Sequence, residues 1–484
     1  MFKNKNRPKF HFSCPKGWLN DPNGFSFFNG EFHLFYQHNP FDTKWGPMHW
    51  GHAVSKNLLK WKNLKPALFP DSAFDNQGCF SGTALAENEK HILIYTGVTK
   101  SDENKNIQQQ CIATGDGKTY SKFPQNPVIK SDDLKVEFNK TDFRDPKIWK
   151  DGDNYFCAAV IQKKDLNGAL AVFTSADLIH WQFKNILAET NGELGGMWEC
   201  PDIFNLENRD VIIISPQQVQ SDKQKGFHDG NNSVYMTGIF DKEKFTFTKD
   251  VRTENNFYAA ELDYGIDFYA PQTMQSPDGR RIMIAWLQAW ESYLTPKNFS
   301  WSGMMTLPRE LFFKDDCLYQ RPVREYEEKI KTMPFLSGRI SKNLFASFDK
   351  YNYPQFELDL TFTLPDSKSE NLQDEKFSVK IFDDKNQFVL FTFDLSSMEL
   401  NFDRSNSIGN GGAINNRAVK VQKTKNSTLS FRFIADTYSC ETFINGGQTV
   451  FTNAFFLNKN VRKIRIDTTL TSGLLFKLIK LNKL

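Results

Sequence analysis

Residues 145–160 read DPKIWKDGDNYFCAAV, which is a polar start, a short strand, an Asp-Gly turn and then a strongly apolar strand. Two short strands joined by such a turn are typical of a β-hairpin. The same order of polar cluster, strand, turn and apolar strand recurs four more times in the first two thirds of the chain. The clusters begin at residues 21, 81, 145, 199 and 271, with spacings of 60, 64, 54 and 72 residues.

A pair of similar segments also supports the repeat. Residues 55–61 (SKNLLKW) match residues 175–181 (SADLIHW) at a separation of 120 residues, about two repeat units. A repeat of this length that is rich in short strands and hairpin turns is typical of a four-stranded propeller blade with long loops. Five units therefore predict a five-bladed β-propeller over residues 1–325, with an irregular pair of β-sandwiches as the alternative.

In a propeller the five polar clusters would lie close together in space. The innermost strand of each blade lines the central axis, so equivalent positions in successive blades point at one funnel. We therefore expect five side chains, up to 251 residues apart in sequence, to converge there: Asp21, Ser81, Asp145, Glu199 and Gln272.

The pattern changes after Arg321-Pro322. Residues 326–334 are predicted to be a linker or part of a short helix. From residue 335 to residue 484 alternating strands predict a C-terminal β-sandwich, among them Gln355–Phe362, Phe377–Ile381, Phe388–Phe393, Leu429–Ile434 and Glu441–Ile444. The predicted fold class is all-β, a five-bladed β-propeller followed by a β-sandwich.

Composition argues against several classes of protein. The 484 residues include 60 Lys and Arg against 57 Asp and Glu, and a net charge of +3 argues against binding to a nucleic-acid backbone. No stretch approaches the roughly 18 apolar residues of a membrane span, and no apolar segment follows the basic N-terminus as in a secretory signal. The seven cysteines are scattered without a C-x-x-C pair, which favours reduced, mostly buried thiols in a cytoplasmic protein and no zinc site.

Three of the clusters contain a carboxylate: Asp21, Asp145 and Glu199. Each acid alone is explained as a solvated turn or strand cap, but acids gathered in one cavity must share protons or bind a cation or a polyol. A metal site is one alternative, although oxygen ligands usually come at denser spacing. Asp151-Gly152-Asp153-Asn154 faintly resembles a calcium loop and is better explained as a hairpin turn. Two carboxylates in different environments are also what cleavage of a glycosidic bond requires.

The neighbouring residues suggest different roles for two of the acids. Glu199 follows Met197-Trp198, an apolar setting that would raise its pKa and suit a general acid. Asp21 lies between Asn20 and Pro22-Asn23-Gly24, where amide donors would keep it ionised as a nucleophile. Side chains that can pack on a sugar ring or satisfy its hydroxyls surround them: Trp18, Trp45, Trp50, Trp198, Phe80, Tyr269, Gln37 and His49.

Three segments carry a family resemblance. Residues 18–24 (WLNDPNG), 143–147 (FRDPK) and 198–202 (WECPD) resemble, in order and spacing, the signature segments of glycoside hydrolase family 32, the β-fructofuranosidases. Further matches are residues 33–37 (HLFYQ), 45–52 (WGPMHWGH), 80–82 (FSG) and 269–272 (YAPQ). The resemblance covers essentially the whole chain and implies a five-bladed propeller, a β-sandwich and a retaining mechanism. No metal ligands are evident in the sequence, and no cofactor is expected.

The resemblance also implies roles for individual residues. Asp21 matches the nucleophile that attacks the fructosyl anomeric carbon, and Glu199 matches the acid/base that protonates the leaving oxygen and later activates water. Asp145 matches the acid that binds fructose hydroxyls and stabilises the transition state, with Arg144 beside it. The positions counted as substrate-binding are Asn20, Gln37, Trp45, Phe80, Ser81, Arg144 and Tyr269.

Within the family, the bacterial cytoplasmic sucrose-6-phosphate hydrolases look most similar, through residues 45–52, 262–273 and 303–310. The resemblance implies release of fructose from sucrose 6-phosphate, sucrose or both. The alternative is an intracellular exo-fructosidase acting on short fructo-oligosaccharides such as kestose. Transfer of fructose to a sugar acceptor stays open, and the three intact acids argue against a non-catalytic sugar-binding protein. The expected partner is a small sugar, with no nucleic acid and no membrane, and no oligomeric state is predicted.

Overall fold

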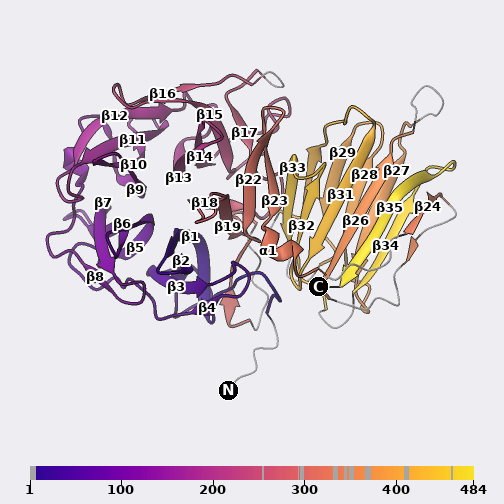
Figure 1. Ribbon diagram of the computed structural model, residues 1–484, viewed down its shortest axis with the longest axis horizontal. Helices are drawn as coiled ribbons and strands as arrows, with labels where there is room; N and C mark the ends of the chain where they lie inside the picture. Colours follow the sequence, from indigo (N-terminus) through magenta and orange to yellow (C-terminus); the bar gives the residue numbers. More distant parts are fainter. Residues whose placement is uncertain are drawn as a thin grey trace.

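The computed structural model describes residues 7–252, 256–292, 294, 299–330, 336–342, 346–347, 354–365, 372–407, 414–458 and 462–483. Within these ranges nearly all regular structure is β-strand. The exceptions are one 3₁₀ turn, η1 (Ser131–Asp133), and one short helix, α1 (Arg324–Glu327). No helix in these ranges is long and apolar enough to cross a membrane. The strands form a disc of five sheets and, beside it, a sandwich of two (Figure 1).

Each of the five sheets in the disc is one propeller blade. Blade I contains β1 (Gly17–Phe28), β2 (Glu31–Asn39), β3 (His49–Ser55), β4 (Lys62–Asn63) and β20 (Trp301–Ser302). Blade II contains β5 (Gly78–Glu87), β6 (Lys90–Lys100), β7 (Asn106–Gly115) and β8 (Tyr120–Lys122). Blade III contains β9 (Phe138–Asp151), β10 (Asn154–Lys163), β11 (Gly168–Ser175) and β12 (Gln182–Glu189). Blade IV contains β13 (Met197–Leu206), β14 (Arg209–Gln217), β15 (Val234–Asp241), β16 (Thr246–Lys249) and β17 (Ala259–Glu261). Blade V contains β18 (Tyr269–Gln275), β19 (Arg281–Leu287), β21 (Met304–Met305), β22 (Arg309–Lys314) and β23 (Cys317–Pro322).

The first strands of the five blades form a closed ring around the axis. β1 contacts β5, β5 contacts β9, β9 contacts β13, β13 contacts β18, and β18 contacts β1 again. The same five labels surround the centre of the disc in Figure 1. The ring therefore closes after five blades, which confirms the five-bladed propeller predicted from the repeat.

The polar clusters lie at bulges inside these inner strands, not at their starts as the sequence pattern suggested. In every blade the pairing of the inner strand with the second strand slips next to the cluster. A β-bulge adds a residue to one strand and redirects the side chains there. In blade II the bulge also requires glycine, because a Cβ on Gly82 would lie 2.0 Å from the carbonyl oxygen of Ile94.

Residues 55–61 and 175–181, which are similar in sequence, form the same type of turn in two different blades. In blade I the Asn57 side chain accepts hydrogen bonds from the backbone N–H groups of Leu59 and Lys60. In blade III the Asp177 side chain accepts the equivalent bonds from the backbone N–H groups of residues 179 and 180. Each turn follows the third strand of its blade, so the separation of 120 residues corresponds to two blades.

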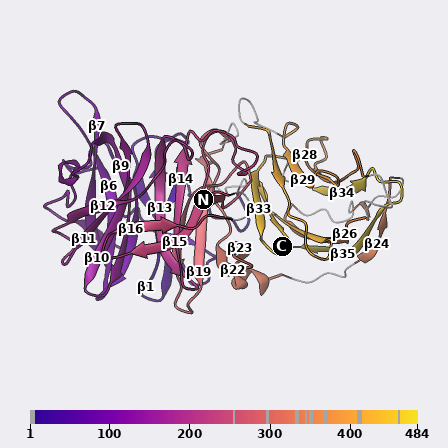
Figure 2. The ribbon, with the colours of Figure 1, turned by 90° about the horizontal axis from the view of Figure 1, so that it is seen from above.

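The sandwich consists of two six-stranded antiparallel sheets. One contains β24 (Leu336–Ile340), β35 (Leu474–Lys483), β26 (Phe356–Thr363), β31 (Thr428–Ala435), β32 (Ser439–Ile444) and β33 (Thr449–Ala454). The other contains β25 (Ala346–Ser347), β34 (Lys463–Thr468), β27 (Lys376–Phe382), β28 (Phe388–Asp394), β29 (Glu399–Asp403) and β30 (Asn416–Lys420). The two layers are seen edge-on in Figure 2. All five strands that the sequence predicted here are present, as β26, β27, β28, β31 and β32.

Phenylalanine fills the space between the two sheets. Phe362 and Phe431 from one sheet pack against Phe377 and Phe393 from the other, and Phe476 completes the cluster. All five are buried, and the packing between the sheets thus uses part of the 46 Phe residues in the chain. The linker predicted at residues 326–334 begins within α1, and its residues 331–334 lie outside the described ranges.

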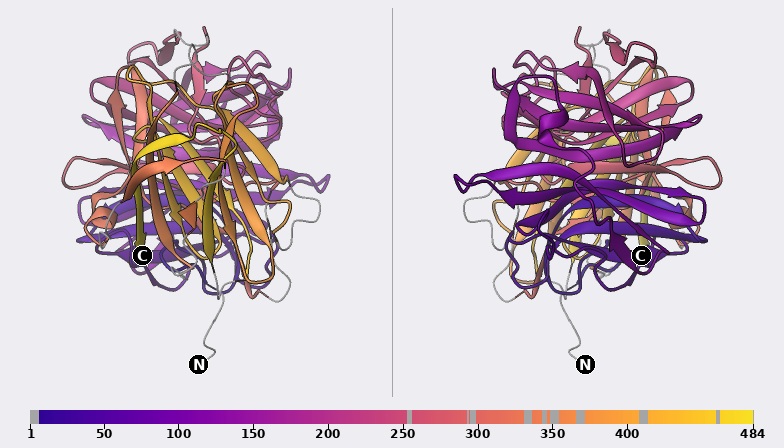
Figure 3. Two further views of the ribbon diagram at one scale, coloured as in Figure 1. Left: turned by 90° about the vertical axis from the view of Figure 1, so that its right-hand side faces the viewer. Right: turned by 90° about the vertical axis from the view of Figure 1, so that its left-hand side faces the viewer.

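A fully buried network of charged side chains joins the sandwich to the propeller, which lie side by side in Figure 2 and one behind the other in Figure 3. The His11 imidazole lies 2.9 Å from Asp436 Oδ2 and 2.7 Å from Glu441 Oε1. Arg309 Nε donates to Glu441 Oε2 at 2.9 Å, and Arg309 Nη1 donates to Asp263 Oδ2 at 2.9 Å. Because the side chains come from the N-terminal segment, the propeller and the sandwich, the network ties all three together.

We expect the protonated form of His11 to stabilise the fold. Burial alone would lower the pKa of His11, but Asp436 and Glu441 raise it to about 9. This contribution is complete below the unfolded-state pKa of about 6.5 and disappears as pH rises through about 9. His11→Gln removes one partner of a buried ion-pair network, at a cost of about 3 kcal/mol, and should lower the melting temperature at pH 6.5 by about 3 °C in a chain of this length. The difference from wild type should shrink at pH 9.5, and an unchanged melting temperature at pH 6.5 would contradict this role.

Candidate active site

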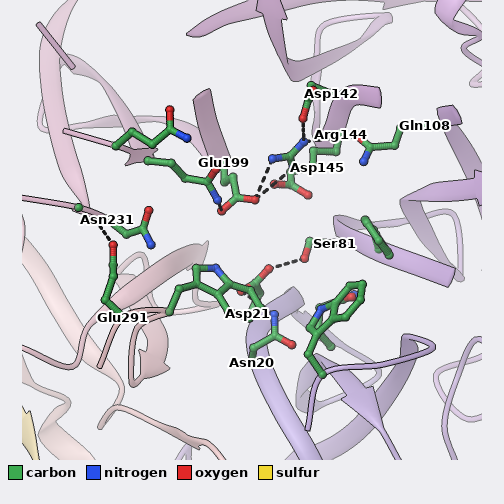
Figure 4. A pocket seen from close by; sticks show the side chains of 17 residues that line it. Asn20, Asp21, Ser81, Gln108, Asp142, Arg144, Asp145, Glu199, Asn231 and Glu291 are labelled. Carbon is green, nitrogen blue, oxygen red and sulfur yellow. Dashed lines mark hydrogen bonds and ion pairs between the residues drawn. The ribbon is translucent and has the colours of Figure 1, made fainter. Parts of the chain in front are cut away.

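A pocket of about 610 Å³ opens among the bulged inner strands, and all five blades contribute to it (Figure 4). Its walls are formed by Asn20, Asp21, Gln37 and Trp45 of blade I, Phe80, Ser81 and Gln108 of blade II, Asp142, Arg144 and Asp145 of blade III, Glu199, Gln217, Gln218, Gly230 and Asn231 of blade IV, and Trp290 and Glu291 of blade V. Acids from four blades therefore face one cavity.

Nine of the ten residues that the resemblance assigns a catalytic or substrate-binding role line the pocket, and Tyr269 is the exception. Four further side chains expected around the acids do not line it: Trp18, Trp50, Trp198 and His49. Tyr269 is fully buried behind the wall, with its hydroxyl 2.8 Å from Glu199 Oε2. Gln272 also lies behind the wall, where its side chain accepts from the backbone of Phe25 and donates to the backbone of Gly82. Four of the five cluster residues thus converge on the cavity, and the fifth joins blade V to blades I and II.

Asp21 is held by donors on both carboxylate oxygens. The Ser81 hydroxyl donates to Oδ2 at 2.6 Å, and the Asn20 amide donates to Oδ1 at 3.0 Å. Asn20 is itself fixed, because the Trp18 indole N–H donates to its side-chain oxygen at 2.7 Å. Burial and the nearby charge of Glu199 raise the pKa of Asp21 to about 6, against the effect of these donors. The group is therefore ionised at neutral pH and more basic than an ordinary aspartate.

Glu199 has a polar setting, which corrects the apolar one expected from its neighbours in sequence. Arg144 donates to Oε1 from Nε at 3.1 Å and from Nη2 at 3.0 Å. Gln217 donates to Oε2 at 2.7 Å, and the Tyr269 hydroxyl donates to the same oxygen. Met197 and Trp198 are buried on neighbouring positions of β13, but the Glu199 carboxylate contacts cationic and amide donors in the pocket.

Asp145 occupies the bulge of β9 with a left-handed backbone (φ 60°). Such a conformation is uncommon outside glycine and typically marks a functional constraint. The backbone N–H of Cys200 donates to Asp145 Oδ2 at 2.9 Å. Burial raises the pKa of Asp145, the Arg144 guanidinium opposes this, and the charges of Glu199 and Asp21 add to it.

Eight pocket residues were missed by the sequence analysis: Gln108, Asp142, Gln217, Gln218, Gly230, Asn231, Trp290 and Glu291. For Asp142 the sequence offers a signal, because this acid lies two positions before Arg144. In the structure Asp142 accepts a hydrogen bond from Arg144 Nη1 at 2.9 Å. Gln217 and Asn231 come from the end of β14 and the loop after it, where no motif marked them. Within the described residues, no group of three or more His, Cys, Asp and Glu side chains is arranged to hold a metal ion.

Known proteins match both halves of the chain. The family model described as "Glycosyl hydrolases family 32 N-terminal domain" matches residues 11–322, and "Glycosyl hydrolases family 32 C terminal" matches residues 328–475. A sucrose-6-phosphate hydrolase of Zymomonas mobilis is 36% identical over 462 residues, covering 91% of this chain and 84% of that protein. A raffinose invertase of Escherichia coli is 32% identical over 493 residues, covering 97% and 95%. The solved structure of a sucrose-6-phosphate hydrolase from Lactobacillus gasseri superposes with a TM-score of 0.84 at 27% identity, covering 99% of this chain and 93% of that one.

Proposed function

Since the chain belongs to glycosyl hydrolase family 32, we propose that it is a retaining β-fructofuranosidase that releases fructose from sucrose 6-phosphate and from sucrose. The observation that carries this proposal is the pocket itself, in which Asp21, Asp145 and Glu199 meet with three different sets of hydrogen-bond partners. Two carboxylates in different environments can divide the work of nucleophile and acid. The names of the relatives from Zymomonas mobilis and Escherichia coli support the substrate class.

Asp21 is proposed as the nucleophile. Its carboxylate attacks the anomeric carbon of the fructosyl unit and forms a covalent intermediate, while the glycosidic bond breaks. The raised pKa makes the carboxylate a better nucleophile, and the donors Ser81 and Asn20 fix its orientation. The hydrogen bond from Trp18 sets which way the Asn20 amide points, so its N–H group faces Asp21.

Glu199 is proposed as the acid/base that protonates the leaving oxygen and then takes a proton from the attacking water. Arg144 donates to the Glu199 carboxylate from Nε and Nη2. Asp145 binds fructose hydroxyls and stabilises the positive charge that develops on the sugar ring.

The pH dependence should report the ionisation of Asp21. A nucleophile with a pKa of about 6 is lost by protonation as pH falls, so kcat/KM should decline below about pH 6. Ser81→Ala removes a donor that favours the charged form, so the acidic limb should move to higher pH. The measurement is the pH profile of kcat/KM for wild type and for Ser81→Ala. If the acidic limb has the same midpoint in both, the limb reports the ionisation of a group other than Asp21.

Competition among substrates tests the proposed substrate class. Sucrose 6-phosphate, sucrose and 1-kestose should be compared by kcat/KM for fructose release, with the phosphorylated sugar preferred by about tenfold, or about 1.4 kcal/mol. Preference for kestose would instead support the exo-fructosidase alternative, and a fructosylated acceptor among the products would show transfer. Hydrolysis of none of the three would contradict the proposed function. The cytoplasmic location expected from the sequence is part of this proposal.

A further inference from the structure

The pocket wall from blades IV and V holds none of the residues that match fructose contacts. Those residues come from blades I to III, including Asn20, Ser81 and Asp145. The remaining wall, called here the leaving-group wall, is formed by Gln217, Gln218, Gly230, Asn231, Trp290 and Glu291. Gln217 donates to Glu199, the proposed proton donor to the leaving oxygen, so this wall is placed beside the leaving group.

Glu291 is the acid of the leaving-group wall, and one of its two carboxylate oxygens is anchored. The backbone N–H of Asn231 donates to Glu291 Oε1 at 2.7 Å, the contact drawn in Figure 4. Gly230 makes room for this contact, since a Cβ there would lie 2.3 Å from Glu291 Oε1. The side chain of Glu291 is exposed, and no described residue donates to its Oε2. Oε2 is therefore free to accept from a ligand in the pocket.

Both chain segments that meet at this contact are fixed by other interactions. The loop before Asn231 is held by two backbone hydrogen bonds of 2.9 Å that Val219 and Gly230 exchange. On the other side, Trp290 stacks on the buried Trp18 with ring centroids 6.1 Å apart. The position of the Glu291 carboxylate is thus set before a sugar binds, which reduces the entropy lost on binding.

The charged groups around Glu291 are mostly of its own sign. Carboxylates of five residues line the pocket: Asp21, Asp142, Asp145, Glu199 and Glu291. Among the described lining residues the one cation is Arg144, which is paired with Asp142 at 2.9 Å and with Glu199 at 3.0 Å. A neutral sugar can donate its hydroxyls to Glu291, whereas a phosphate beside Glu291 is repelled by this carboxylate.

We propose that Glu291 is a specificity-determining residue, whose carboxylate accepts hydroxyls of a neutral leaving sugar and disfavours a leaving sugar that carries a phosphate. This inference rests on the proposed function, because it needs a fructoside as substrate. It concerns the change in the ratio of two substrates, sucrose and sucrose 6-phosphate, and so applies whichever of them the wild type prefers. A phosphate on a hexose that contacts Glu291 lies within about one sugar ring of the carboxylate, inside the screening length of about 8 Å at physiological salt.

Glu291→Gln tests the charge. Glutamine keeps the size of the side chain and an oxygen that can accept from Asn231, and it removes the negative charge. The ratio of kcat/KM for sucrose 6-phosphate to kcat/KM for sucrose should rise at least about fivefold. The inhibition constant of glucose 6-phosphate should fall by a similar factor relative to that of glucose, while inhibition by fructose stays unchanged. Glu243→Gln, on the exposed turn between β15 and β16, removes the same charge elsewhere and should keep the wild-type ratio.

Glu291→Ala tests the hydrogen bonds to the sugar. Loss of a charge-assisted hydrogen bond should raise KM for sucrose about tenfold, with a smaller change in kcat, and weaken inhibition by glucose similarly. Salt gives an independent readout, because added sodium chloride screens the repulsion of the phosphate. The ratio of the two substrates should therefore rise with salt in the wild type, and rise less in Glu291→Gln.

The outcomes separate this inference from the function on which it rests. A wild-type protein that hydrolyses no fructoside contradicts the proposed function and this inference with it. An active wild type in which Glu291→Gln changes neither the substrate ratio nor the two inhibition constants overturns the inference alone. An equal shift in Glu243→Gln does the same, since overall charge would then explain the effect. If the wild type cleaves only sucrose, the inhibition constants decide. If Glu291→Gln fails to fold, inhibition of the wild type by glucose 6-phosphate decides, and inhibition that does not strengthen with salt relative to that by glucose contradicts the proposal.

Discussion

Asp21→Asn is expected to lower kcat for hydrolysis of sucrose by at least about 10⁴-fold, the scale on which loss of a nucleophile acts. Asparagine has nearly the shape of aspartate and can still accept from Ser81, so the pocket should keep its form. The neutral amide cannot form the covalent fructosyl intermediate, and water alone attacks slowly. The measurement is initial rate against substrate concentration, with a circular dichroism spectrum to establish folding.

The Asp21→Asn variant also allows a chemical test of whether residue 21 lies beside the anomeric carbon. A small external nucleophile such as azide can enter the space that the carboxylate leaves and attack the anomeric carbon directly. The product should then carry the configuration opposite to that of the wild-type product, because one displacement replaces two. Asp151→Asn, at the blade III hairpin turn, is the control and should keep wild-type rates. Retention of more than about 1% of wild-type kcat in Asp21→Asn would remove Asp21 from the nucleophile's role.

The propeller was predictable because its repeat is local. Each blade begins with a hairpin whose turn and apolar second strand can be recognised within about 16 residues, as at residues 145–160. The radial symmetry of a propeller then predicts that equivalent strands of all blades face one axis. Asp21, Ser81, Asp145 and Glu199 could therefore be placed in one cavity without knowledge of any contact between them.

The backbone at the site could not be predicted in the same way. Bulges in the inner strands place the acids inside β9 and β13, and two residues there, Asp145 and Cys200, adopt left-handed conformations without being glycine. Side-chain type gives no reliable sign of such a conformation, because surrounding packing imposes it. The sequence pattern therefore located the clusters and misjudged where the strands begin.

The setting of Glu199 shows a second limit. Its sequence neighbours on β13 are apolar, yet its carboxylate meets Arg144, Gln217 and Tyr269 from three other strands. In a strand, neighbouring side chains point to opposite faces, so the residues next to an acid in sequence are poor guides to what surrounds it. Only the three-dimensional arrangement places the donors of blades III, IV and V around one carboxylate.

Glu199→Gln is expected to lower kcat/KM for sucrose by about 10²–10⁴-fold, as removal of a general acid/base does. The loss should depend on the leaving group, because the acid is needed only where the departing oxygen must be protonated. With an aryl fructoside that releases a stable phenolate, the first step should recover, and a rapid burst of phenolate should precede slow turnover. The slow phase arises because the same carboxyl must activate water in the second step. Azide, which needs no base, should accelerate that phase.

Comparing Glu199→Gln with Asp21→Asn then distinguishes the roles of the two acids. An activated leaving group removes the need for a proton donor and leaves the need for a nucleophile, so it should restore the first step in Glu199→Gln and not in Asp21→Asn. Both variants retain side chains of nearly native size, and therefore a difference between them reports chemistry more directly than packing. If the aryl fructoside rescued both variants equally, or rescued Asp21→Asn alone, the assigned roles of Asp21 and Glu199 would have to be exchanged or abandoned. If it rescued neither, while both proteins remained folded, Glu199 would not be the leaving-group acid.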